Sequence, residues 1–118
     1  MKWASSVSEL PDLEQAIDEC TTGLLKSLGD AQPDLAVVFV SPHYESEYDR
    51  VVQLIAEKLG PVKIFGCSGG GVIGNGVEVE QRPGISITGA NLPGVEIIDF
   101  HLDGDSLPDL DAGPTSWE

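Results

Sequence analysis

Apolar residues recur at helical spacing in the first third of the chain. Between residues 12 and 29 they fall three or four positions apart and form one stripe: Leu13, Ala16, Ile17, Cys20, Leu24 and Leu28. Asp12 stands at the N-cap position, with Gln15 three residues on as in a capping box. Gly29 offers the left-handed conformation that ends many helices. The pattern predicts an amphipathic helix over residues 13–28.

A second helical pattern occupies residues 43–59. Its apolar stripe consists of Tyr44, Tyr48, Val51, Val52, Ile55 and Leu59. Gly60 and Pro61 follow directly and predict where the helix ends.

Between and around these helices lie segments with strand patterns. Residues 35–40 (LAVVFV) and the segment from residue 62 (VKIFGCSG) are apolar without polar alternation, which is typical of parallel strands buried on both faces. Residues 1–8 alternate more weakly and predict a first strand. Strand, helix, strand, helix, strand over this length implies right-handed βαβ crossovers and a parallel sheet.

In the last third of the chain, apolar and polar residues alternate, as they do in a strand with one buried face. Residues 77–81 and 84–91 alternate around the turn sequence RPG, and residues 95–102 (VEIIDFHL) alternate again after LPG. Three strands in series predict an antiparallel meander. The predicted fold class is therefore α/β: a βαβαβ parallel sheet followed by an antiparallel β meander, giving a mixed sheet with two helices.

Chain length and composition limit the domain organisation. A chain of 118 residues with 41% hydrophobic residues is enough for one domain with one core. We expect residues 1–102 to form an α/β domain that is part of a larger one. Residues 103–118, rich in acids, Pro and Gly, are expected to form an acidic linker or tail.

The net charge of −14 excludes several classes of partner. Nucleic acid and anionic membrane surfaces both require clustered Lys and Arg, whereas this chain has six bases against twenty acids. No apolar run approaches the length of a membrane span, and the N-terminal residues lack the apolar segment of a secretory signal. We therefore predict a cytoplasmic protein. Its acidity suits solubility, or alternatively a basic protein partner.

Six of the fourteen glycines fall within residues 66–76, GCSGGGVIGNG. Gly69, Gly71 and Gly74 match the spacing of the dinucleotide-binding fingerprint, but an alternating strand pattern follows them instead of a helix. A Walker loop needs a lysine that this segment lacks. The segment therefore predicts neither a dinucleotide nor a nucleotide phosphate, and we expect no cofactor.

The ends of two predicted parallel strands define a candidate ligand site. The carboxyl ends of such strands meet at one rim of the sheet, where open α/β sheets bind ligands. The residues predicted to contact a ligand there are Ser41, His43, Gly66, Cys67, Ser68, Gly69, Gly70 and Gly71. Glycines allow backbone N–H groups to approach a small molecule closely.

Cys67 leaves three interpretations open: contact with a ligand, packing, or chemistry. Paired with His43, its thiol would be activated for nucleophilic attack, but no third residue that orients the pair is evident. We assign no catalytic residue. The two cysteines and two histidines have no metal-ligand spacing, so no metal site is predicted.

The strand DLAVVFVSPHY and the segment GCSGGGVIGNGVEVEQRPGISI resemble the N-terminal domain of FIST proteins, in particular the cyanobacterial and plant branch. The resemblance covers roughly residues 1–102. It implies an intracellular sensory, non-enzymatic domain that binds small ligands such as amino acids. Val72 departs from the family pattern, because many bacterial members have an acid there, so no role of that acid is carried over.

Three functions follow as hypotheses. The first is a signal-transduction domain that binds a small metabolite at the glycine-rich strand end. The second is a thiol-dependent enzyme using Cys67 with His43. The third is an interaction module in which an exposed sheet edge pairs with a protein partner or a second copy.

Overall fold

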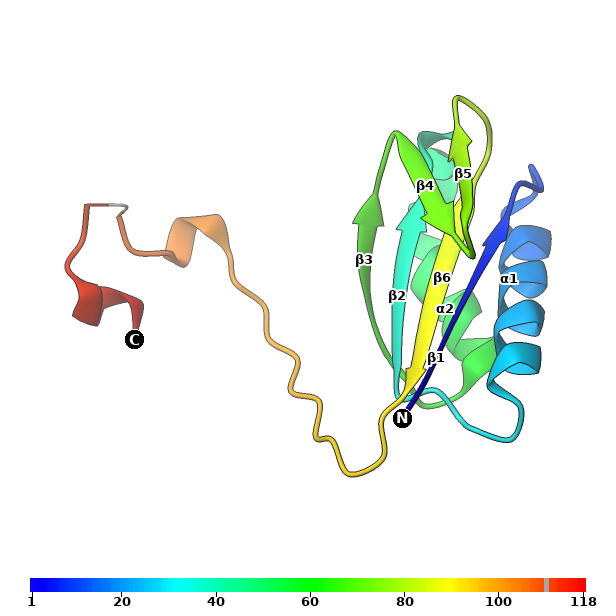
Figure 1. Ribbon diagram of the computed structural model, residues 1–118. Helices are drawn as coiled ribbons and strands as arrows, with labels where there is room; N and C mark the ends of the chain where they lie inside the picture. Colours follow the sequence, from blue (N-terminus) through cyan, green and yellow to red (C-terminus); the bar gives the residue numbers. More distant parts are fainter. Residues whose placement is uncertain (110) are drawn as a thin grey trace.

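The computed structural model describes residues 1–109 and 111–118, and Figure 1 shows a mixed sheet with two helices on one face. In chain order the elements are β1 (Lys2–Ser8), α1 (Leu13–Leu28), β2 (Leu35–Val40), a 3₁₀ helix (Pro42–Glu47), α2 (Tyr48–Leu59), β3 (Lys63–Ser68), β4 (Gly71–Gly74), β5 (Val77–Glu80) and β6 (Ile85–Asn91). Short 3₁₀ turns follow at Gly104–Ser106 and Pro114–Trp117. The α/β class, the two helices and the mixed sheet are confirmed.

The main sheet has the order β1-β6-β2-β3. β6 runs antiparallel to both of its neighbours, while β2 and β3 are parallel, so β1, β2 and β3 all point the same way. The three strands of the βαβαβ pattern are therefore codirectional as expected. However, β6 separates β1 from β2, an arrangement that depends on contacts distant in sequence.

The expected meander differs from the structure in its pairings. β5 pairs with β4 in a separate two-stranded hairpin, and β6 enters the main sheet. Asn75 and Gly76 both have positive φ, 48° and 75°, which identifies the tight hairpin turn that an Asn-Gly pair favours. The prediction missed this turn because it treated residues 66–76 as one loop.

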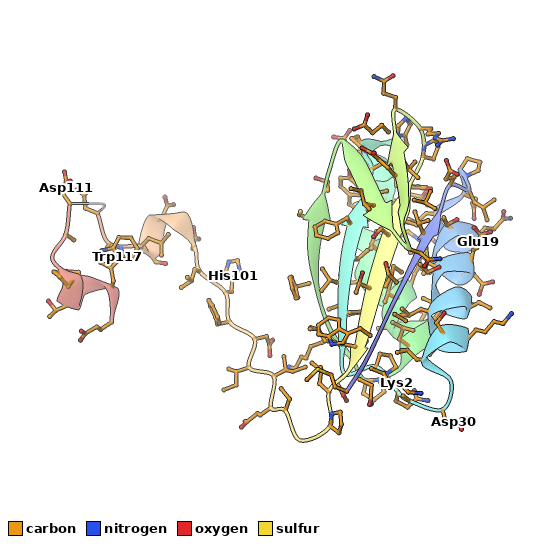
Figure 2. All side chains as sticks on the ribbon, in the orientation of Figure 1. Lys2, Glu19, Asp30, His101, Asp111 and Trp117 are labelled. Atoms are coloured by element: carbon orange, nitrogen blue, oxygen red, sulfur yellow. The ribbon has the colours of Figure 1, made fainter. Side chains whose placement is uncertain are left out.

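The prediction of a last strand over residues 95–102 is wrong. Residues 95–102 belong to no strand, and Figure 1 shows the chain leaving the sheet after β6 and running outward. Figure 2 places His101 and Trp117 on this outlying segment, away from the sheet.

The core lies between the helices and one face of the sheet. Asp12 caps α1 by accepting a 2.9 Å hydrogen bond from the Gln15 backbone N–H, and Gly29 ends the helix with φ 65°, as predicted. The inward sheet side chains include Ala36, Val38, Val40, Ile85 and Ile87, and they pack against the predicted stripe of α1 and against Val51, Leu54, Ile55 and Leu59 of α2.

The second helix departs from its prediction at two points. Residues 42–47 form a 3₁₀ helix before α2 begins, with Pro42 at its first position. Val52, expected on the buried stripe, is 56% exposed, whereas Leu54 is buried in its place. The stripe on α2 is therefore turned so that Val52 lies at the margin of the core.

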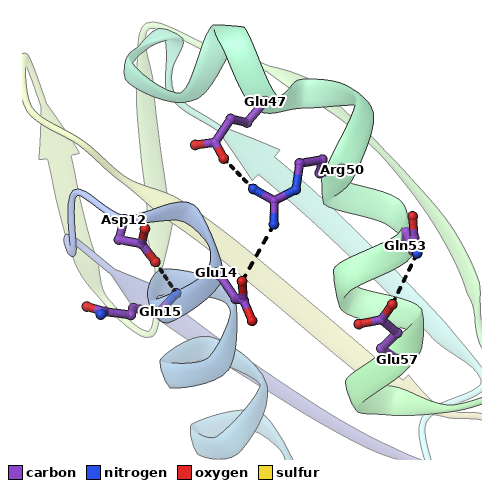
Figure 3. A network of polar contacts seen from close by, with 7 residues as sticks. All are labelled: Asp12, Glu14, Gln15, Glu47, Arg50, Gln53 and Glu57. Carbon is purple, nitrogen blue, oxygen red and sulfur yellow. Dashed lines mark hydrogen bonds and ion pairs between the residues drawn. The ribbon is translucent and has the colours of Figure 1, made fainter.

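Ion pairs link the exposed surfaces of the two helices. Arg50 lies 2.5 Å from Glu47 and 3.5 Å from Glu14 of α1, as Figure 3 shows, and Lys58 lies 2.9 Å from Asp18. Solvent-exposed pairs of this kind contribute about 0–1 kcal/mol each. The helices are therefore held mainly by their buried apolar faces.

The opposite face of the sheet is only partly covered. The β4–β5 hairpin crosses one end of it, where Val72 and Val79 are buried and the Ser86 hydroxyl donates a 2.6 Å hydrogen bond to the Ile73 carbonyl. Further along, Trp3, Phe39 and Phe65 remain 56%, 41% and 61% exposed. The prediction that β2 and β3 are buried on both faces is therefore wrong, because the hairpin covers only part of this face and β3 lies at the edge of the sheet.

Gly66 allows β3 to lie close against β2. A Cβ at this position would lie 1.8 Å from the backbone oxygen of Val38, its partner in the parallel register, and 2.9 Å from Val38 Cγ1. Real Cβ atoms do not come so near, so any side chain forces the two strands apart. In contrast, a Cβ on Gly70 would have no atom within 4 Å.

We therefore predict that Gly66→Ala lowers the free energy of unfolding by about 2 kcal/mol or more, as over-packing in a closely packed site does. Gly70→Ala is the matched control and should change stability by less than about 0.5 kcal/mol. Urea denaturation followed by circular dichroism measures both. Equal stabilities of the two variants would contradict the close approach of β2 and β3.

Two buried acidic groups make the fold sensitive to alkaline pH. Burial raises the pKa of the Cys20 thiol to about 12, and the nearby Glu19 carboxylate acts in the same direction. Burial likewise raises the pKa of the Tyr44 hydroxyl to about 12, with smaller contributions from Cys20 and Asp12. Cys20 Sγ donates to the Ile85 carbonyl at 3.4 Å, and the Tyr44 hydroxyl donates to the Leu10 carbonyl, so both groups are held protonated.

Because both folded pKa values lie above the ordinary values of 9.0 and 10.0, the unfolded chain loses these protons first. Stability should be fully present below pH 9 and should fall as pH rises toward 12. Urea midpoints measured from pH 7 to 11 test this. Cys20→Ala should reduce the alkaline decline, whereas the exposed Cys67→Ala should leave it unchanged; the same decline in both variants would rule out Cys20 as a source.

Candidate functional site

The structure brings the ends of β2 and β3 together as the sequence predicted. Val40 is the register partner of Ser68, and the Gly69 N–H donates a 2.9 Å hydrogen bond to the Val40 carbonyl. Ser41 therefore lies beside the start of the glycine run. The parallel pairing of β2 with β3 is what places these two segments at one rim.

Ser41 is buried and its hydroxyl already has partners. Its Oγ accepts a 3.0 Å hydrogen bond from the Gly84 N–H and lies 3.3 Å from His43 Nδ1. The Ser41 backbone N–H also donates a 2.9 Å hydrogen bond to the Gly84 carbonyl. Ser41 thus joins the end of β2 to the start of β6, a structural role that the sequence did not indicate.

His43 is exposed and lies just after β2, in the 3₁₀ helix. Among the described residues its ring has one protein partner, the Ser41 hydroxyl, and no hydrogen bond joins it to Cys67. The side chain of Cys67 is exposed on β3, next to Phe39 in the register. The pairing of thiol and imidazole that nucleophilic catalysis would need is therefore not formed in this structure.

The glycines of the candidate site have different roles. Gly66 is required by the approach of β2, and a Cβ on Gly71 would lie 3.1 Å from Glu80 Cγ in the neighbouring strand β5. A Cβ on Gly69 would lie 3.2 Å from the Gly71 carbonyl oxygen, whereas Gly70 faces open space. None of these four has the positive φ that glycine tolerates best. Packing and pairing therefore account for Gly66 and Gly71, whereas Gly70 is exposed and no neighbouring atom requires a glycine there.

An apolar groove lies between α2 and β3. It has a volume of about 220 Å³, and its walls are formed by Val38, Val40, Tyr48, Val51, Val52, Ile64, Phe65, Gly66, Cys67 and Ser68. We call it the α2–β3 groove. Three of the predicted site residues, Gly66, Cys67 and Ser68, line it. The sequence did not predict α2 as a wall, because the exposure of Val52 depends on how the helix is rotated against the sheet.

The groove has a polar end and an apolar end. At the rim, Ser68 and Tyr48 both line the groove, and the Tyr48 hydroxyl donates a 3.2 Å hydrogen bond to the Ser41 carbonyl. Toward the start of β3, the lining is formed by Ile64, Gly66 and Val52. This arrangement suits a small molecule with one polar and one apolar part.

Two further findings limit the kind of site. The described residues contain no group of three or more His, Cys, Asp or Glu side chains placed to hold a metal ion. In that same part of the chain, no helix has the length and hydropathy that a membrane span requires.

Comparison with known proteins identifies the chain at the level of family. Residues 34–106 match the FIST N domain. Two curated relatives from Mycobacterium tuberculosis, the uncharacterized proteins MT0656 (strain CDC 1551 / Oshkosh) and Rv0628c (strain ATCC 25618 / H37Rv), are each 30% identical over 106 residues. The alignment covers 87% of this chain but 26% of each relative, so the chain spans about a quarter of their length. The matched segment begins just before β2 and includes both strand ends of the candidate site. The chain therefore belongs to the FIST N domain family, a family of sensory domains.

Proposed function

We propose that this domain is a non-enzymatic sensor that binds a small metabolite, of the size of an amino acid, at the rim formed by the ends of β2 and β3. The observation that carries the proposal is the position of this rim. The Gly69 N–H donates to the Val40 carbonyl, which holds the glycine run beside the end of β2, and Ser68 lines the α2–β3 groove at this end of the strands. Gly70 and His43 follow these strand ends in the chain, and both are exposed. Membership in a family of sensory domains is consistent with that use.

The chemistry of the rim favours a ligand with a carboxylate or another hydrogen-bonding head group. Backbone N–H groups at glycines approach such a group without steric hindrance, and the Ser68 hydroxyl can donate or accept a hydrogen bond. The apolar part of the ligand would lie against Val40 and Tyr48. The other proposed contacts are Ser41, Gly66, Cys67, Gly69 and Gly71.

The groove is small for a ligand site. Its volume of about 220 Å³ lies below the several hundred cubic ångströms typical of pockets for drug-sized molecules. This favours a compact metabolite over a nucleotide. The net charge of −14 would slow the approach of an anion, so a zwitterionic amino acid suits the rim better than a dicarboxylate.

The proposal extends to location and to chemistry. We infer that the domain is cytoplasmic. We also infer that its signal passes to another protein and that it is not an enzyme, because the site holds binding groups without a formed nucleophile–base pair. Cys67 would then act as a contact residue, and the output would come from a change in the surface that the bound ligand stabilises.

Thermal unfolding in the presence of each of the twenty amino acids, at millimolar concentration, tests ligand binding. A ligand at 100 times its dissociation constant stabilises the folded state by about 2.7 kcal/mol, which raises the midpoint of a small domain by several degrees. Ser68→Ala should reduce that shift. Ser106→Ala, an exposed serine outside the site, is the matched control and should preserve it. If no amino acid raises the midpoint of the unaltered protein, the proposed ligand class is wrong.

Alkylation of the two cysteines distinguishes the sensor hypothesis from the hypothesis of a thiol-dependent enzyme. With iodoacetamide at pH 8, the folded protein should gain one label at the exposed Cys67, whereas the buried Cys20 should react only after unfolding. Intact-mass measurement counts the labels. His43→Ala should leave the rate at Cys67 unchanged, because His43 bonds Ser41 instead of the thiol. A strong loss of rate in that variant would favour the enzyme.

A further inference from the structure

The outer edge of β3 has no strand partner among the described residues. β3 pairs with β2 on one side only, and it ends the sheet order β1-β6-β2-β3. The backbone groups along such an edge are a template for another strand. The α2–β3 groove lies beside this edge, and Val52 in its wall is 56% exposed. Both the hydrogen-bonding edge and the apolar groove beside it are therefore unfilled.

A segment with a strand pattern lies within reach of this edge. Residues 95–102 alternate between two sets of side chains, and Ile98, Phe100 and Leu102 are 75%, 81% and 61% exposed. Figure 1 shows that this stretch leaves the sheet at the end where β3 begins. Three consecutive apolar residues of one set, all facing solvent, are unusual for a chain with a strand pattern.

One contact already joins this segment to β3. Lys63 Nζ donates a 2.6 Å hydrogen bond to Asp99 Oδ1, and both side chains are more than half exposed. An exposed pair of this kind adds little stability. Its importance is positional, because it places Asp99 beside the first residue of β3.

We propose that residues 97–103 add to the free edge of β3 as a fifth strand of the main sheet, parallel to β3, and that Phe100 and Leu102 fill the apolar end of the α2–β3 groove. The Lys63–Asp99 contact sets the register. Side chains alternate in both strands, so Asp99 beside Lys63 puts His101 beside Phe65 and Asp103 beside Cys67. These residues share the face of the sheet that is turned away from the helices.

The same register places the apolar set on the helix side. Ile98 then lies beside Val62, Phe100 beside Ile64, and Leu102 beside Gly66. Ile64 packs against the core and lines the groove, and Gly66 has no side chain to occupy the space next to it. The unfilled volume thus lies where the two exposed apolar side chains would enter, while the Ser68 end of the groove stays open.

The chain is long enough to make this connection. Ala90 of β6, Leu35 of β2 and Lys63 of β3 form one row across the sheet. A strand beyond β3 would lie about 14 Å from β6, at about 4.8 Å per strand, and eight linking residues reach about 26 Å when extended. After β6 the chain already makes a turn at residues 92–95, in which Gly94 has φ 78° and the Val95 N–H donates to the Leu92 carbonyl at 3.2 Å. This turn directs the chain away from the end of β6.

Disulfide formation with the natural Cys67 tests the register directly. Neighbouring strands hold paired Cα atoms at a distance that suits a disulfide, so Asp103→Cys should cross-link to Cys67 within one chain under mild oxidation. Leu102→Cys is the matched control, because the proposed register puts its side chain on the other face, and it should cross-link at least tenfold more slowly. Cys20 is buried and does not compete. Cleavage after Glu57, Glu78 and Glu96 would show residues 58–78 joined to residues 97–118.

Equal rates for the two variants would overturn the proposal. So would a bond formed only between chains, which would show that the edge takes the segment of a second copy. Neither outcome depends on ligand binding, so the proposed sensor function is tested separately.

Stability gives an independent test that does not need the engineered thiol. If Phe100 stays 81% exposed, Phe100→Ser should leave the thermal midpoint within about 1 °C. If Phe100 fills the groove, the same change should lower the midpoint by about 5 °C or more. His101→Ser, on the opposite face of the proposed strand, is the control and should have little effect. An unchanged midpoint for Phe100→Ser would contradict the proposal.

Discussion

The pairing of β6 between β1 and β2 is the interaction on which the rest of the structure depends. Seven residue pairs join β6 to β1 and six join it to β2. Its inward side chains Ile85 and Ile87 are fully buried against the helices. Without β6, the first strand would have no strand partner in the main sheet, because β1 and β2 are not paired. The last regular strand of the chain thus closes a sheet whose other members precede it.

This central strand also fixes the geometry of the candidate site. The Gly84 backbone, immediately before β6, exchanges two hydrogen bonds with Ser41 at the end of β2. That contact anchors the segment carrying His43, while the parallel pairing with β2 positions Ser68 and Gly69 beside it. The rim is therefore formed by three strands whose ends meet at one end of the sheet.

The glycine-rich segment has two structural uses, close packing and a tight turn. Its first glycine lets β3 approach β2, and a later one, Gly74, lets the β4–β5 hairpin cross β1, where a Cβ would lie 2.9 Å from the Ser6 carbonyl oxygen. Asn75 and Gly76 then form the hairpin turn. The composition alone did not separate these uses, because a glycine needed for close packing and one needed for a turn look the same in a sequence. Gly70 differs from both, because a Cβ there would have no atom within 4 Å.

The sequence by itself determined the elements whose signals are local. The stripe and cap of α1, the continuous apolar strands β2 and β3 and the common direction of the βαβαβ strands follow from residue spacing and from the handedness of crossovers. The gathering of the strand ends at one rim follows from the same rules. The tertiary structure alone decided the neighbours: β6 between β1 and β2, the hairpin folded over the open face, the rotation of α2 that exposes Val52, and the bonds of Ser41. These depend on side chains far apart in the chain competing for the same buried surface, and the spacing of residues along one segment carries no information about that competition.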